Sequence, residues 1–251
     1  TQKTYAVGQK QFIKFCNSLD LTYCPTSEKT ILNFIADCND RNLRHGTILS
    51  YMYGVRSLHL ENGLQDPLKD SFKIKRALKA IQKSQDNTSN QKLAISHEIM
   101  KSLIHLHTDS HDNIVLWSAI TMAFFGLFRC GEITLGDHQI FDPDVHMTRD
   151  CVTMVHEKNI EYMKVFLKCS KTDTIGTGIE VVIGCSQHNV CVVHAMKKNL
   201  YIAKHAHPKS PLFVLQNGKI LNRSTFVNQT KQCLLKLGIN PSKYSGHSFR
   251  I

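Results

Sequence analysis

The sequence lacks an apolar run long enough to cross a membrane. Its longest one, IVLWSAITMAFFGLF at 114–128, has 15 residues and ends at Arg129, whereas a membrane-spanning helix needs about 20. No secretory signal peptide is visible after Thr1, and no internal repeat is apparent. We therefore expect no membrane partner, and we interpret 113–128 as a buried core helix.

Acidic residues are scarce beside basic ones: 20 Asp and Glu stand against 31 Lys and Arg, which gives a net charge of +11. This excess favours a polyanionic partner, most simply nucleic acid, although a merely basic protein fits the charge equally well. Hydrophobic residues make up 42% of the chain, enough for a packed core and too many for bulk disorder. The nine cysteines show no disulfide-framework spacing, which indicates reduced thiols.

The first third of the chain predicts four helices, at 4–19, 25–38, 46–63 and 70–85, because apolar residues recur there at helical spacing. The last of them carries a set of basic residues: Lys73, Lys75, Arg76, Lys79 and Lys83. Such a set is most often a solvated face, but beside a duplex it would contact phosphates. We therefore hypothesise a helical DNA-binding domain at 1–84.

The polar stretch at 85–95 has no apolar periodicity and predicts a linker. The second domain, 96–251, begins with Ser96 as a helix cap and contains three segments rich in β-branched residues within 151–184. Helices at 190–205 and 223–238 follow, with a short hairpin around Asn217 and Gly218 between them. The expected fold class is mainly α with a small β-sheet, that is, α+β.

Four basic residues and one acid in this second domain have ordinary explanations when each is taken alone. Arg129 would end the buried helix, where Glu132 could hold it in a structural ion pair. Lys171 lies in a Gly-containing turn. His247 and Arg250 have the i, i+3 spacing of one helix face and would pass for a surface pair.

Together, GLFRCGEI at 126–133, LKCSKTD at 167–173 and SGHSFRI at 245–251 resemble the tyrosine recombinase/phage integrase family. The HSFRI and SKTD forms look most like the recombinases of crypton- and DIRS-type mobile elements. The resemblance implies an N-terminal SAM-like helical core-binding domain, a linker and a catalytic domain whose sheet carries a lysine. It also implies double-stranded DNA as the partner and leaves open a homo-oligomer on DNA.

In this family a tyrosine hydroxyl attacks a phosphodiester and forms a 3′-phosphotyrosyl link, with no metal or other cofactor. By resemblance, Arg129 and Arg250 would bind the non-bridging oxygens, which suits planar, permanently charged guanidinium groups. His247 would donate a hydrogen bond or transfer a proton. Lys171 would protonate the leaving 5′-oxygen, with Lys168 as the next candidate, and Glu132 would brace Arg129.

The family's nucleophilic tyrosine follows the HxxR motif, and the sequence ends before it. Tyr244, Tyr201 and Tyr162 do not match its place, so the sequence is interpreted as a fragment truncated before the catalytic Tyr, inactive in cleavage as it stands. The alternative is a domesticated, catalytically inactive DNA-binding protein. A eukaryotic mobile element, or a gene derived from one, would place the protein in the nucleus.

A rival pattern is the regular spacing of Cys185, His188, Cys191 and His194, since such pairs can bind zinc. Zinc sites usually have a longer gap between their two pairs, and Cys191 and His194 fall in a predicted helix. The sequence therefore favours buried thiols and helix-start residues here, with no metal site.

Overall fold

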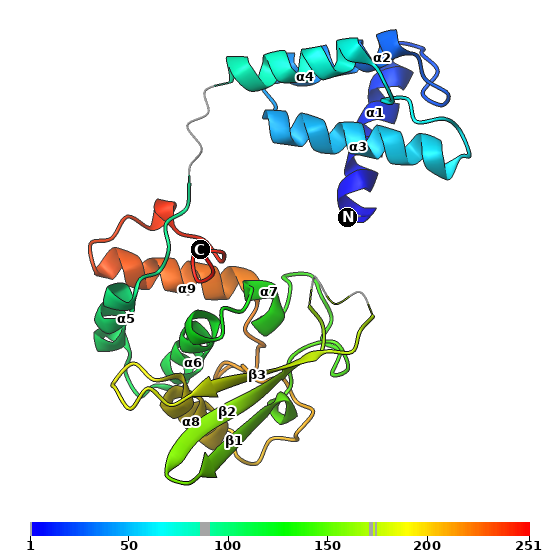
Figure 1. Ribbon diagram of the computed structural model, residues 1–251. Helices are drawn as coiled ribbons and strands as arrows, with labels where there is room; N and C mark the ends of the chain where they lie inside the picture. Colours follow the sequence, from blue (N-terminus) through cyan, green and yellow to red (C-terminus); the bar gives the residue numbers. More distant parts are fainter. Residues whose placement is uncertain (1, 86–90, 171–172, 174) are drawn as a thin grey trace. The chain divides into compact units, whose positions relative to one another are not determined.

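The computed structural model describes residues 2–85, 91–170, 173 and 175–251 (Figure 1). The chain divides into two compact units, Thr1–Ser89 and Asn90–Ile251. Within the described ranges, no helix combines the length and the apolar character needed to span a bilayer.

The first unit consists of α1 (Gln2–Ser18), α2 (Glu28–Asp40), α3 (His45–Glu61) and α4 (Phe72–Ser84). The hydroxyls of Ser27 and Ser71 accept backbone hydrogen bonds at the starts of α2 and α4, which satisfies N–H groups that have no partner within the helix. Helices α1 and α3 cross where Gly8 and Gly54 meet, since a Cβ on Gly54 would lie 2.7 Å from the Tyr5 carbonyl oxygen. The core of this unit contains Phe12, Phe34, Ile48, Met52 and Ile74.

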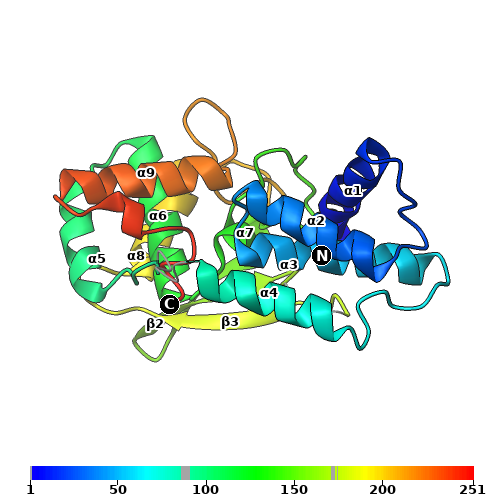
Figure 2. The same ribbon diagram turned by 90° about the horizontal axis from the view of Figure 1, so that it is seen from above.

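The second unit is built around α6 (His111–Phe125), whose residues 115–123 are all buried. Helix α8 (Val192–Ile202) and helix α9 (Arg223–Lys236) both contact α6, and Figures 1 and 2 show α6 between them. The remaining helical pieces are short: α5 (His97–Leu103), α7 (Cys130–Ile133) and the 3-10 turns Ile104–Leu106, Arg149–Cys151 and Pro241–Lys243. Ser96 caps α5 as expected, its hydroxyl accepting from the Ile99 N–H at 3.3 Å.

An antiparallel sheet of three strands, β1 (Val152–Glu157), β2 (Ile160–Leu167) and β3 (Ile179–Gly184), has β2 in its centre. The register pairs Val152 with Val165 and Leu167 with Ile179. Alternate residues of β2 (Met163, Val165 and Leu167) are buried in the same core as α6, because successive side chains of a strand point to opposite faces. The mainly α fold with a small sheet, expected from the sequence, is confirmed.

Three local expectations differ from the structure. Helix α6 ends at Phe125 rather than at 128, because the Phe128 ring packs back over Gly126, at 2.3 Å from where a Cβ would stand, and Leu127 takes a left-handed conformation (φ 50°). Around Asn217 and Gly218 the expected chain reversal is present, closed by an antiparallel bridge between Val214 and Ile220, but regular strands do not form there.

The linker is shorter than the expected 85–95, because the residue at each of its ends is held by a folded unit. The Gln85 side chain binds the backbone of His45 and Leu43 in the first unit. Ile95 is buried in the second unit, where its N–H donates to the Ser248 carbonyl at 2.7 Å. The compositional signal marks polar residues, and some of these are held by specific hydrogen bonds that composition does not reveal.

Candidate functional site

Arg129 lies at the start of α7 rather than at the end of α6. Its Nη1 donates to Glu132 Oε1 at 2.8 Å, and its backbone N–H donates to Glu132 Oε2 at 2.7 Å. The Glu132 side chain is only 9% exposed, and that of Arg129 is 27% exposed. The ion pair expected from the sequence is therefore present, and it fixes the guanidinium while part of it faces solvent.

His247 and Arg250 are on an exposed turn close to the end of the chain. The Arg250 N–H donates to the His247 carbonyl at 2.9 Å, and the Ser248 N–H donates to the Ser245 carbonyl at 3.0 Å, so the segment is one helical turn. His247 and Arg250 are exposed, whereas Ser248 and Phe249 are buried. The i, i+3 spacing thus places both candidate residues on the outer side of the turn, as predicted.

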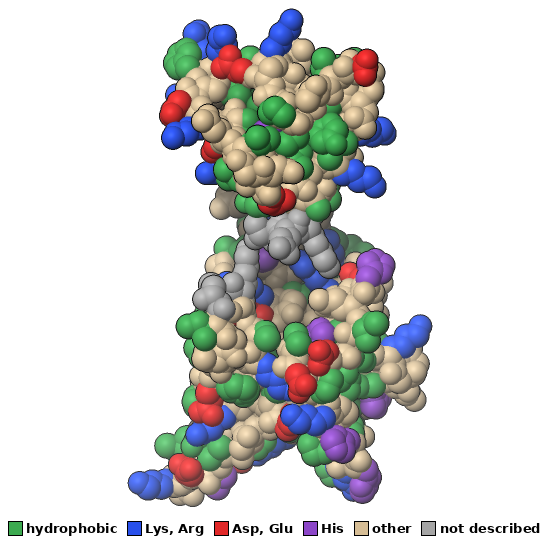
Figure 3. All heavy atoms as spheres, turned by 90° about the vertical axis from the view of Figure 1, so that its right-hand side faces the viewer, with side chains coloured by type: hydrophobic (Ala, Val, Ile, Leu, Met, Phe, Trp, Pro, Cys, Tyr) green, Lys and Arg blue, Asp and Glu red, His purple; other side chains and the backbone are tan. Residues whose placement is uncertain are grey.

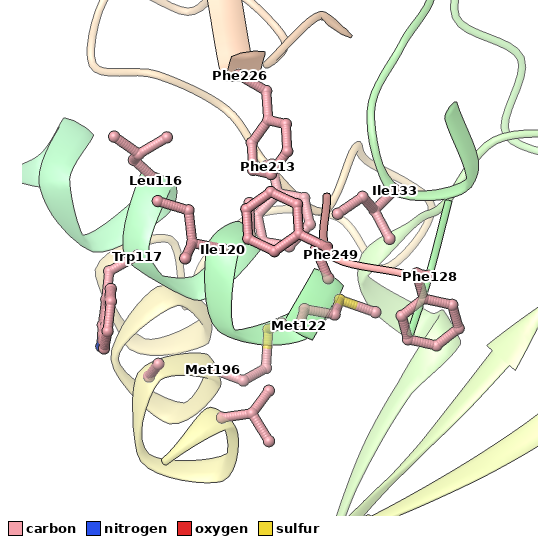
Figure 4. Packing of buried hydrophobic residues seen from close by; sticks show 14 of the residues in the cluster. Leu116, Trp117, Ile120, Met122, Phe128, Ile133, Met196, Phe213, Phe226 and Phe249 are labelled. Carbon is pink, nitrogen blue, oxygen red and sulfur yellow. The ribbon is translucent and has the colours of Figure 1, made fainter. Parts of the chain in front are cut away.

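Each arginine directly follows a buried phenylalanine. Phe128 is 2% exposed and Phe249 is 4% exposed, and both belong to one hydrophobic core. Figure 4 shows Phe249 inside this core near Ile120, Phe226 and Ile133; its ring centroid lies 5.6 Å from that of Phe226. Core packing therefore sets the backbone position from which each guanidinium extends.

The two arginine turns touch through Gly246 and Cys130. A Cβ on Gly246 would stand 3.0 Å from Cys130 Cβ and 3.5 Å from its Sγ. The first of these distances is tighter than ordinary van der Waals contact. Cys130 is the neighbour of Arg129, and Gly246 is the neighbour of His247. Residues about 120 positions apart in sequence are thus placed side by side, and the small glycine allows this approach.

The loop after β2 reaches the same region. Cys169 lines a cavity of about 130 Å³ together with Gly131 and Glu132 of α7. Lys171, the lysine predicted as general acid, lies outside the described residues. Cys169, a described residue of the second motif, thus lies beside the Arg129 turn.

Lys168, the second candidate for an acid, has a structural role instead. Its Nζ donates to the Pro143 carbonyl at 2.5 Å, to the Thr148 hydroxyl at 2.6 Å and to the His146 carbonyl at 3.4 Å. An ammonium has three N–H donors, and all three are accounted for. Lys168 therefore ties the 143–148 segment to the end of β2.

Asp173 organises the far side of this loop. Its carboxylate accepts from the backbone N–H groups of Gly176 and Gly178, both at 2.8 Å, and at longer distances from Ile175 and Thr177. The hydrogen bonds from Gly178 and Gly176 hold the pKa of Asp173 below its usual value. Gly176 has a φ of 78° and Gly178 a φ of 70°, a left-handed conformation that glycine adopts readily. Asp173 is not among the site residues expected from the sequence, although the D-x-x-G-x-G spacing at 173–178 is visible there.

Two further cations on α9 were also missed. The Arg223 N–H donates to the Leu135 carbonyl at 2.8 Å, two residues after α7, which places Arg223 near the Arg129 turn. Lys231 lines a small cavity with Ser245 and Gly246. The spacing of eight between Arg223 and Lys231 puts them on one face of α9, a signal that the sequence offered.

In the first unit, Lys73, Lys75, Arg76, Lys79 and Lys83 are all exposed on α4, while Ile74 and Ile81 are buried. Lys73 pairs with Glu28, Nζ to Oε2 at 3.2 Å, and Arg76 lies over the exposed Phe72 ring at 6.0 Å from its centroid. On the face shown in Figure 3, Lys and Arg side chains project from the outline of this unit. Helix α4 therefore presents a cationic surface.

The second unit has a helical core, a three-stranded antiparallel sheet and two arginine turns in contact, and solved structures share this fold. The integrase of the Tn1549 transposon in complex with transposon right end DNA aligns with a TM-score of 0.54 at 13% identity, covering 89% of this chain and 70% of that chain. The same integrase with circular intermediate DNA gives a TM-score of 0.52 at 14% identity, over 91% and 71% of the two chains.

No family model matches the sequence. An integrase/recombinase xerD homolog of Selenomonas ruminantium is 26% identical over 262 residues, which covers 100% of this chain and 71% of that protein. By this relationship and this fold, the chain is similar to proteins of the tyrosine recombinase/integrase family.

Proposed function

We propose that this protein binds duplex DNA and serves site-specific recombination through a 3′-phosphotyrosyl intermediate. The observation that carries the proposal is the contact of Gly246 with Cys130, which brings the turn of His247 and Arg250 beside that of Arg129. The similar integrase structures contain DNA, in agreement with the cationic surface of α4. The net charge of +11 supports the same partner.

Each proposed role follows from the surroundings of the residue. Arg129, held by Glu132, and Arg250, which is exposed, would donate to the non-bridging oxygens of one phosphate, where charge builds in the transition state. Rigid placement matters because phosphoryl transfer depends mostly on positioning and electrostatics. His247 would add a donor beside Arg250. Lys171 would protonate the leaving 5′-oxygen.

The attacking tyrosine is assigned to none of the tyrosines near the motifs. Tyr244 is 7% exposed and packed in the core, so its hydroxyl is not free to approach a phosphate. Tyr201 is exposed on α8 and lies under the Lys204 ammonium at 5.2 Å. Tyr162 pairs with Gly184 within the sheet. The 251-residue chain should therefore bind DNA without forming a covalent adduct.

The binding step is tested by replacing the α4 cations that face solvent. A variant with Lys75, Arg76, Lys79 and Lys83 changed to Ser should bind duplex DNA more weakly, and its plot of log K against log salt should be flatter by up to about 0.9 per lost phosphate contact. A matched control changes four lysines of the second unit that lie outside the three motifs: Lys158, Lys197, Lys198 and Lys204. An unchanged slope in the α4 variant would mean that this helix does not face DNA.

The cleavage step is tested with the protein encoded by the full source transcript. On a suicide DNA substrate it should form an adduct that survives EDTA, and Lys171→Ala should be rescued in part by a thiolate leaving group, which needs no proton. DNA binding without any adduct would instead favour a domesticated DNA-binding protein.

We further propose a crypton- or DIRS-type mobile element as the source and the nucleus as the location. The HSFRI and SKTD segments support this assignment. Imaging the tagged full-length protein in its own cells tests the location, and exclusion from the nucleus would contradict it.

A further inference from the structure

Two cysteines and a histidine cluster where β3 passes into α8, in the connection at 185–191 (Figure 1). Cys185 directly follows β3, Cys191 is the N-cap of α8, and His194 is in the first turn of α8. Their ligand atoms all lie within 4.8 Å of one another. The recombination motifs do not include these residues, so their proximity needs another explanation.

Two of the three distances within the cluster are close to those around a tetrahedral zinc ion. Cys185 Sγ lies 3.4 Å from Cys191 Sγ and 3.6 Å from His194 Nε2. Bonds of about 2.3 Å to sulfur and about 2.0–2.1 Å to nitrogen at tetrahedral angles give an S–S separation of about 3.8 Å and an S–N separation of about 3.6 Å. The third distance, between Cys191 and His194, is within 4.8 Å, so an ion would be held after small side-chain adjustments.

The surroundings suit a thiolate. Cys191 is the N-cap of α8, and the start of a helix stabilises negative charge. Cys191 and His194 also line a cavity of about 140 Å³, which has room for a water molecule as a further ligand.

We propose that Cys185, Cys191 and His194 bind one zinc(II) ion, with solvent in the fourth position. Binding releases the two thiol protons and cross-links the end of β3 to the start of α8. The fourth residue of the sequence pattern, His188, is exposed on the connection, and the cluster does not include it. The regular four-residue pattern thus reduces to three ligands once the chain is folded.

Cobalt(II) is the probe, because its spectrum reports thiolate ligation and tetrahedral geometry. The reduced, chelator-treated 251-residue chain should bind one equivalent, with a thiolate-to-cobalt band in the near ultraviolet and strong visible bands, and zinc(II) should displace it. Cys185→Ser and Cys191→Ser should abolish the ultraviolet band, and His194→Gln should weaken binding at least tenfold. Two matched controls, Cys169→Ser at an exposed thiol and His188→Gln on the same connection, should bind as the unchanged chain does.

Stability gives a second readout if a variant folds poorly. Zinc(II) should raise the melting temperature of the unchanged chain and of both controls, but not that of Cys185→Ser, because only a folded site gains binding energy. The proposal is overturned if the reduced chain shows no thiolate–cobalt band, or if His188→Gln loses it. Rapid formation of a Cys185–Cys191 disulfide that zinc(II) does not slow would likewise overturn it. All these readouts are independent of DNA cleavage.

Discussion

The two units carry their positive charges in different ways. In the first unit the cations are spread along one exposed helix, α4, whose inner side packs on the core through Ile74 and Ile81. In the second unit Arg129 and Arg250 each follow a buried phenylalanine, and their turns meet at Gly246 and Cys130. One surface suits contacts with many phosphates, and the other suits exact placement around a single phosphate.

This difference separates affinity from chemistry. A charge on an exposed helix acts through its number and its field, and a neighbouring cation can partly replace it. A guanidinium beside a reacting phosphate acts through position, where a displacement of 1 Å costs on the order of 100-fold in rate. Changes in the second unit should therefore have larger effects than similar changes in the first.

The largest effect is expected from the phenylalanine that precedes Arg129. Phe128→Ala should lower the free energy of unfolding of the second unit by about 3–5 kcal/mol, since it empties a packed site. Phe72, which is 71% exposed on α4, is the matched control, and Phe72→Ala should change stability by less than about 0.5 kcal/mol. Denaturant unfolding of each variant measures both. If both variants lowered the free energy of unfolding by the same small amount, Phe128 would not anchor the Arg129 turn.

The next effect concerns the arginines themselves, in the protein encoded by the full source transcript. Arg250→Ala should raise the activation free energy of single-turnover strand cleavage by about 3–4 kcal/mol, the scale of a lost oxyanion donor. The melting temperature should not change. Arg129→Ala should slow cleavage similarly but also lower stability by about 1–3 kcal/mol, because Glu132 loses its charged partner. Cleavage by Arg250→Ala at the unchanged rate would contradict the assignment of that residue.

Much of this comparison was accessible from the sequence. Apolar periodicity predicted the main helices, enrichment in β-branched residues predicted the strands, and the order of three short motifs indicated the resemblance to the family. The contact of Gly246 with Cys130 could not be predicted, since it depends on packing between segments about 120 residues apart. The three-residue cluster of Cys185, Cys191 and His194 was set aside for the same reason: spacing along the chain does not show which side chains a turn brings together.

One histidine in each unit extends the comparison to pH: His59 is buried, and His107 is partly buried. In the first unit both ring nitrogens of His59 are hydrogen-bonded, to Val55 and Thr26. In the second unit His107 packs on Trp117 at 4.7 Å, and its ring nitrogens have no hydrogen-bond partner among the residues described. Burial lowers the pKa of His107 to about 4.

As the pH falls, His107 is therefore protonated in the unfolded chain before it is protonated in the folded chain. The free energy of unfolding has its full value above pH about 6.5 and decreases as the pH drops towards 4. At pH 5 the loss should be about 2 kcal/mol, at about 1.4 kcal/mol per pH unit. His107→Phe should remove this loss, whereas His105→Gln, at an exposed histidine, should keep it. Parallel pH profiles of His107→Phe and the unchanged chain would exclude His107 as the cause.

The smallest effect separates two lysines within α4. Lys79 is exposed and has no ion pair among the residues described, whereas Lys73 already pairs with Glu28. Lys79→Ser should weaken DNA binding several-fold and reduce the slope of log K against log salt by about 0.9, the share of one phosphate contact. Lys73→Ser should change the slope less, because a lysine held by a carboxylate neutralises less phosphate charge. Titrations of a labelled duplex at several salt concentrations measure both variants. If Lys73→Ser has the larger effect, the side of α4 next to Glu28 of α2 faces DNA, and the stripe of Arg76, Lys79 and Lys83 faces solvent.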